Sequence, residues 1–324
     1  MRKPFIAEDY GDFISVSKEN VVLKNRDKAE STPLKELSHI IIKGSYISFS
    51  SAFIFKCLKK NIPIILLDDF WKPYSVISKY GKSNDLSKLQ YKFSDTSRSS
   101  VFVSGLLKQK IRRQHQVLHY HIRSLRLNRK EEVKNIEGYD FRNFLDSLDY
   151  YFKRKESVKE IRQELFLLEA RSSRAYWKAF SKFFPDSFFP GRQKRNAEDP
   201  INKLLNYGYA LLSSLILKTM ILSGLDPAVS LLHHRKELAF PFLYDLMEPL
   251  RPVADHIVIS FIHKQKKPVL DRYSKIRKSV LRRFRRFWFE NINKPLPWSK
   301  SKKPAEKLIV ELIEKYKKAV LQRH

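Results

Sequence analysis

The spacing of apolar residues along the chain changes character near residue 88. Before that point, short runs rich in β-branched residues alternate with polar turn residues, which is typical of strands. The strands predicted from these runs are 13–16, 21–23, 38–44 and 61–68. A short helix, capped by Ser50 or Ser51 and ending at Leu58, is expected between the last two strands.

After residue 88, apolar residues recur at helical spacing over long stretches. These stretches are 101–121, 141–152, 161–184 and 200–222. Asp199 and Pro200 have the residue types of an N-cap and a first helical position, Gly224 closes that helix, and Asp226-Pro227 predicts the start of another short one. The pattern therefore predicts an α+β chain, with a small β-rich domain at 1–88 and a larger all-α domain at 89–324.

The strand–helix–strand passage within 38–68 is also compatible with a nucleotide-binding unit. Its linking turn, 44–48, lacks both a G-x-G-x-x-G pattern and a phosphate-binding lysine. We therefore interpret this passage as a packing unit.

The net charge of the chain indicates which classes of binding partner to expect. Lys plus Arg number 64 and Asp plus Glu 34, a formal net charge of +30. Residues 1–88 hold only 15 basic and 10 acidic side chains, so most of the excess lies in the helical part. Such a balance attracts polyanions, with nucleic acid the first candidate and an anionic membrane surface the second. The segment 275–288 has seven Lys or Arg around an apolar stripe, a pattern suited to a phosphate backbone.

The chain has one cysteine, Cys57, and no apolar leader at its N-terminus. Its most apolar run, 209–222, is shorter than the roughly 20 residues that a spanning helix needs. We therefore expect a cytoplasmic protein without a membrane partner.

Candidate chemistry lies in three acidic residues and a histidine pair. Glu169 is expected on a largely apolar helix face, where a carboxylate needs a metal or a basic partner. His233 and His234 follow an apolar pair, and Asp245 and Glu248 are three residues apart. By residue pattern alone, salt bridges and ordinary structural roles remain open, with Arg251 close enough in sequence to pair with either acid.

A rival histidine cluster lies at residues 115, 119 and 121. Arg112, Arg113 and Arg123 surround it with positive charge, which disfavours a bound cation. We interpret it as part of a basic helix.

The chain resembles the universal spacer-acquisition integrases of CRISPR systems, the CRISPR-associated "Cas one" family. The matching segments are Leu168-Glu169-Ala170, 199–202 (DPIN), 205–212 (LNYGYALL), 224–227 (GLDP), Leu232-His233 and 245–252 (DLMEPLRP). The resemblance implies a β-rich dimerisation domain and a helical catalytic domain with one metal site. It departs from the family pattern at Ser230, where the family usually has glycine, and His234 makes the position of the histidine ambiguous by one residue.

Carried onto this sequence, the resemblance implies Glu169, His233 and Glu248 as catalytic metal ligands for Mg²⁺ or Mn²⁺. Asp245, Asn202 and His234 would be auxiliary. The DNA-binding candidates are the basic residues Arg192, Arg235, Lys236, Arg251, Arg282, Arg283, Arg285 and Arg286.

The implied activity is insertion of spacer DNA into the repeat array by attack of a 3′-hydroxyl, together with endonuclease activity. The implied partners are double-stranded DNA (prespacer and CRISPR repeat), a second copy of the chain and the small "Cas two" protein. The alternatives are a casposase-like mobile-element integrase and a non-catalytic scaffold for DNA or RNA.

Overall fold

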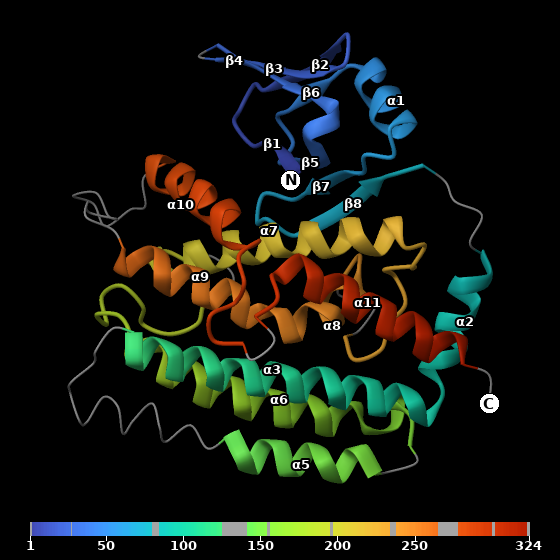
Figure 1. Cartoon of the computed structure of the whole chain (residues 1–324), viewed down its shortest axis with the longest axis vertical. Coiled ribbons are helices and arrows are strands. Elements are labelled where there is room, and N and C mark those ends of the chain that lie inside the picture. The colour runs from blue at the N-terminus through green and yellow to red at the C-terminus, as the bar shows by residue number, and fades with distance from the viewer. Residues whose placement is uncertain are drawn as a thin grey trace.

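The computed structural model describes residues 2–26, 28–79, 84–124, 141–153, 156–194, 197–233, 238–264, 278–299 and 302–322. A strand-rich region is followed by a mostly helical one, which confirms the predicted α+β fold (Figure 1). The division after residue 88 stays a prediction, and helix α2 (Asn84–Ser94) spans that position.

Two four-stranded sheets form the N-terminal region. One has the order β1-β5-β7-β8 and the other the order β4-β3-β2-β6. The strands are β1 (Lys3–Ala7), β2 (Phe13–Ser17), β3 (Asn20–Lys24), β4 (Ala29–Pro33), β5 (Leu37–Lys43), β6 (Ser48–Phe49), β7 (Ile64–Leu67) and β8 (Pro73–Ile77), with a short 3-10 turn, η1 (Leu34–Glu36), before β5. Strands β5 and β7 run parallel because α1 (Ser51–Lys59) connects them. Ser50 accepts a hydrogen bond from the Phe53 N–H and caps α1, as the sequence indicates.

The remaining elements are helical. They are α3 (Ser97–Ser124), α5 (Phe141–Lys153), α6 (Val158–Ser181), α7 (Pro200–Leu222), α8 (Pro241–Met247), the 3-10 turn η3 (Glu248–Leu250), α9 (Arg251–His263), α10 (Lys278–Asn291) and α11 (Ala305–Leu321). Figure 1 shows α7 beneath the sheet, with α3, α6 and α5 on the far side of the helical region. The four helices predicted from periodicity are all present, with ends that differ by a few residues.

The prediction of a short helix starting at Asp226-Pro227 is wrong, because this segment forms a turn. The Asp226 carboxylate accepts a hydrogen bond from the Ala228 N–H at 2.8 Å, and Gln90 holds the Asp226 main chain. Side-chain bonds of this kind compete with helix formation.

Helix α7 is the centre of the molecule. It is long and apolar enough to cross a membrane, but 78% of its most apolar stretch is buried inside the protein, as in a core helix. Gly208 on α7 allows close packing, since a Cβ there would lie 2.9 Å from the ring of Trp288 on α10. The sheet shares this core, because Ile41, Ile65 and Leu67 belong to the same hydrophobic cluster as the helices.

Candidate metal centre

A pocket of about 970 Å³ opens between α3, α6, α9 and the loop before α7. The predicted ligands Glu169, His233 and Glu248 all line it. Glu169 comes from the middle of α6, His233 from the loop after α7, and Glu248 from the η3 turn between α8 and α9. Residues that are far apart in sequence are thus brought into one site by the fold.

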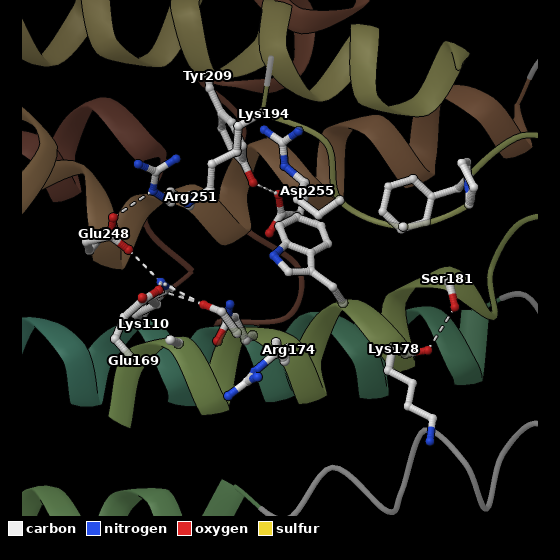
Figure 2. Close-up of a pocket in the computed structure, with 18 of the residues that line it drawn as sticks. Lys110, Glu169, Arg174, Lys178, Ser181, Lys194, Tyr209, Glu248, Arg251 and Asp255 are labelled. Carbon is white, nitrogen blue, oxygen red and sulfur yellow. Dashed lines mark hydrogen bonds and ion pairs between the residues drawn. The ribbon is translucent and has the colours of Figure 1, made fainter. Parts of the chain in front are cut away.

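A buried lysine joins the two glutamates (Figure 2). Lys110 on α3 contacts Glu169 Oε1, and its Nζ lies 2.6 Å from Glu248 Oε2. Ser173, one turn after Glu169, donates a hydrogen bond to Glu169 Oε1 at 2.6 Å, and Arg251 Nε lies 2.9 Å from Glu248 Oε1. Each acid therefore has a cationic partner. For Glu169, this agrees with the expectation that a carboxylate on a largely apolar helix face needs one.

These cations keep both carboxylates ionised. Burial alone would raise the pKa of Glu248, but the charges of Arg251 and Lys110 outweigh it and hold the pKa below its usual value. Burial acts on Glu169 in the same direction, and Lys110 again outweighs it and lowers the pKa. Both carboxylates are therefore anionic at neutral pH.

Asp245 orients His233. Its carboxylate, which is fully buried, lies 2.6 Å from His233 Nδ1 and accepts hydrogen bonds from the N–H groups of Leu231, Leu232 and His233. Burial lowers the pKa of His233, but the hydrogen bond to Asp245 and its charge give a net rise. Donation from Nδ1 to Asp245 leaves the lone pair on Nε2, which lies 4.0 Å from Glu248 Oε1.

This set of side chains fits a hard divalent cation. Two carboxylates already converge on one positive group, the Lys110 ammonium, and an imidazole nitrogen lies beside one of them. A carboxylate behind the histidine is the usual support for a metal-ligating imidazole. Within the described residues, no group of three His, Cys, Asp or Glu side chains is already close enough to hold a metal ion. In this arrangement the Lys110 ammonium lies between Glu169 and Glu248.

Asn202, predicted as an auxiliary residue, lies beside Arg192 and does not line the pocket itself. Its amide accepts hydrogen bonds from Arg192 Nη1 at 2.8 Å and from the Gln193 N–H, so it positions Arg192. Arg192 and Arg251 both line the pocket, and their guanidinium groups lie 5.3 and 5.0 Å from the ring centre of Tyr209. The other auxiliary candidate, His234, lies outside the described residues.

The remaining DNA-binding candidates differ in exposure. Arg282 and Arg286 on α10 are exposed, whereas Arg283 and Arg285 are half-buried. Arg285 forms an ion pair with Glu8 at 3.1 Å, which docks α10 on the N-terminal region. Arg235 and Lys236 lie outside the described residues, and the DNA-binding roles of the whole set stay predictions.

Two features of the pocket were missed from the sequence. One is Lys110. The sequence feature that could have indicated its burial is its position between apolar residues on one face of a helix. The other is Asp255, which accepts hydrogen bonds from Tyr176 and Tyr209 at 2.8 and 2.5 Å. Burial raises the pKa of Asp255 to about 6.

The rival histidine cluster is divided between two environments. His121 is buried and shares a hydrogen bond with His256 at 2.9 Å. The rings of His115 and His119 lie near each other, 4.1 Å apart, beside Phe141.

The fold is similar to that of a casposase bound to its integration product. That structure aligns with a TM-score of 0.79 and 21% identity, over 99% of this chain and 90% of that chain. A Cas1 protein from Thermotoga maritima aligns with a TM-score of 0.76 and 15% identity, over 100% and 98% of the two chains.

Sequence comparison then identifies the family. The family model described as CRISPR associated protein Cas1 matches residues 6–281, and the chain therefore belongs to the Cas1 family. A CRISPR-associated endonuclease Cas1 from Korarchaeum cryptofilum is 26% identical over 266 residues, 79% of this chain and 77% of that protein. One from Hyperthermus butylicus is 29% identical over 231 residues, 70% and 67% of the two chains.

Proposed function

We propose that this protein is a metal-dependent DNA integrase and endonuclease of CRISPR adaptation, which inserts spacer DNA into the repeat array. One observation carries the proposal. The buried Glu248 and the half-buried Glu169 converge on a single cationic group, beside an imidazole whose Nε2 lies 4.0 Å from Glu248 Oε1, in a pocket lined by basic side chains.

Glu169, Glu248 and His233 would hold Mg²⁺ or Mn²⁺, ions that accept carboxylate and imidazole ligands. When bound, such an ion polarises the phosphate and stabilises the charge on the attacking and leaving oxygens. Asp245 accepts a hydrogen bond from His233 Nδ1, so Nε2 would be the ligating nitrogen. Arg251 holds the oxygen of Glu248 that Lys110 does not contact.

The rest of the pocket suits a DNA backbone. Ala170, Ser173, Arg174, Trp177, Lys178 and Ser181 form one face of α6 that extends away from Glu169, and all line the pocket. Arg192 and Lys194 face them from the loop before α7. Basic side chains bind phosphates without reading bases, so we expect binding to tolerate many sequences.

The reaction that fits this pocket is direct transesterification. A DNA 3′-hydroxyl held along α6 attacks a phosphorus atom of the target, a new P–O bond forms, and the target's 3′-oxygen leaves. Water can attack in the same way and gives endonuclease cleavage. Cys57 is buried in the N-terminal core and is therefore not available as a nucleophile. Positioning and charge stabilisation supply most of the acceleration in phosphoryl transfer, and the described side chains are arranged for both.

The proposed partners are a second copy of this chain, the small Cas2 protein and double-stranded DNA, prespacer and repeat, in the cytoplasm. A Cas6-RT-Cas1–Cas2 complex aligns with a TM-score of 0.75 and 18% identity, over 98% of this chain and 35% of that chain. A Cas1–DNA complex aligns with a TM-score of 0.55 and 12% identity. These likenesses support the partners by analogy of fold.

Strand transfer into plasmid DNA tests the function. A short duplex with free 3′-hydroxyl ends is incubated with supercoiled plasmid carrying a CRISPR repeat, with and without Mn²⁺. We expect joining by the wild-type protein and loss of joining in Glu169→Gln and Glu248→Gln, with DNA binding retained. The control is Glu306→Gln on α11, which removes a carboxylate that pairs with Lys218 and should not affect joining. Donors that end in a dideoxynucleotide should not be joined. Equal joining by Glu248→Gln would refute the metal site and support a different catalytic centre.

The same assay addresses a second candidate, a casposase-like integrase, which the likeness of fold to the casposase suggests. A plasmid without a repeat is used as a parallel target. Insertion concentrated at repeat borders supports CRISPR adaptation, whereas equal insertion into the repeat-free plasmid supports the casposase-like activity. A protein that binds DNA but joins neither target would be a non-catalytic scaffold.

A further inference from the structure

Lys110 occupies the place where the two proposed acidic ligands meet. Its ammonium contacts Glu169 Oε1 and lies 2.6 Å from Glu248 Oε2 and 3.2 Å from Ser173 Oγ. Only 6% of its side chain is exposed. A lysine this buried is uncommon unless it has a partner, and here it has two carboxylates.

The helix that carries Lys110 is fixed against the turn that carries Glu248. One turn further along α3, Arg113 donates a hydrogen bond to the Pro249 carbonyl at 2.6 Å. Leu107 and Ile111 beside Lys110 are buried in the same core as α6. The backbone of residue 110 is therefore held in place, so the ammonium could leave the carboxylates only by rotation of the side chain within the pocket that it lines.

We propose that Lys110 is a built-in counter-cation, which divalent metal displaces from Glu169 and Glu248 when it binds. The inference rests on the proposed metal site. An ammonium and a dication that share the same two carboxylates would lie within a few ångströms of each other, where like charges in a buried site repel strongly. Lys110 and the metal therefore compete for the same oxygens.

The competition has two consequences. In the metal-free protein, Lys110 offsets the repulsion between the Glu169 and Glu248 carboxylates, and so it preserves the site in an ordered form. In the metal-bound protein, its displacement subtracts from the binding free energy, so Lys110 weakens metal affinity. A neutral side chain at this position should reverse both effects.

The test compares Mn²⁺ affinity, measured by calorimetric titration without DNA, and thermal unfolding with and without Mn²⁺. Lys110→Met removes the charge and keeps the side-chain length, and Lys110→Arg keeps the charge. The control is Lys108→Met, which removes a lysine on the same helix that pairs with the exposed Asp149. Lys110→Gln, with a polar head group, is measured alongside in case the methionine variant folds poorly.

We expect Lys110→Met and Lys110→Gln to bind Mn²⁺ about tenfold more tightly than wild type, a change within the range produced by groups that contact metal ligands. Without metal they should unfold at a lower temperature, and Mn²⁺ should raise that temperature more than in wild type. Lys110→Arg and Lys108→Met should stay close to wild-type affinity.

Unchanged or weaker Mn²⁺ binding in both neutral variants would overturn the inference. If Glu248→Gln abolishes Mn²⁺ binding in that same experiment, the proposed function survives and only the role of Lys110 is wrong. If the wild-type protein itself binds no Mn²⁺, the metal site and the inference both fail.

Discussion

Replacing Asp245 by asparagine should disable His233 as a ligand while leaving the chain folded. The Asp245 carboxylate accepts four hydrogen bonds, from His233 Nδ1 and from three consecutive backbone N–H groups. An amide has only one accepting oxygen. With that oxygen toward Leu231 and Leu232, the NH₂ group faces His233, and one backbone bond is lost. In the opposite orientation two backbone bonds are lost, so the first orientation is favoured.

The favoured orientation changes the proton on His233. The NH₂ group of the introduced amide would donate to Nδ1, so the imidazole proton would move to Nε2 and block ligation there. One lost bond to a charged group costs about 1.5–3 kcal/mol, well below the typical total stability of about 5–15 kcal/mol. The metal affinity should fall by about 10–100-fold, as expected for a partner behind a metal ligand.

Calorimetric titration with Mn²⁺ and thermal denaturation of the Asp245→Asn protein measure the two effects separately. Asp226→Asn is the matched control, because Asp226 also accepts two hydrogen bonds in the segment that leads to His233, from Ala228 N–H and the Ser87 hydroxyl. The control should lose stability and keep its affinity. Wild-type Mn²⁺ affinity in Asp245→Asn would refute the proposed orientation of His233.

Three further changes test other parts of the molecule. Gly208→Ala should destabilise the fold by about 1–3 kcal/mol, because the new methyl would lie 2.9 Å from the Trp288 ring; an unchanged melting temperature would contradict this. Burial lowers the pKa of His39 from 6.5 to about 3, so its folded-state pKa lies below its unfolded-state value and stability is lost as pH falls from 6.5 toward 3. His39→Gln should reduce this loss of stability by up to about 1.4 kcal/mol per pH unit. The difference between the free energies of unfolding measured at acidic and at neutral pH should therefore be smaller in the variant. Replacing the exposed Arg282 and Arg286 by Gln should reduce the slope of log affinity for duplex DNA against log salt by about 1.8, and an equal slope would exclude both from the DNA contact.

Much of the fold was predictable because its signals are local. Helices such as α7 combine a strong apolar period with a recognisable first turn at Asp199-Pro200, and the structure has them where the pattern indicates. Asp226-Pro227 has similar residue types but no helix, because the Asp226 side chain bonds to the turn itself and to Ser87 on α2. That second contact joins residues 139 positions apart, which no local pattern contains.

The candidate site was predictable only in part for the same reason. The motifs around Glu169, His233 and Glu248 identified residues that the fold brings to one pocket. They did not identify Lys110, because a lysine in a basic stretch of helix has the same sequence signature whether it faces solvent or two acids. The apolar residues beside Lys110 on the helix were the one feature of the sequence that could have indicated its burial. The place of Asn202 beside Arg192 likewise depends on the path of the loop before α7.

The β1-β5-β7-β8 sheet shares one core with the helices, so the chain cannot be cut between them without exposing apolar surface. Ile41, Ile65 and Leu67 would lose their cover if the helical part were removed, and α7 would expose the matching surface if the sheet were removed. We therefore expect heat to melt both regions in a single calorimetric transition. A chimera that joins the strands of one relative to the helices of another would pair two packing surfaces that do not match. We expect it to remain soluble only if the packing residues of the sheet and of the helices come from the same relative.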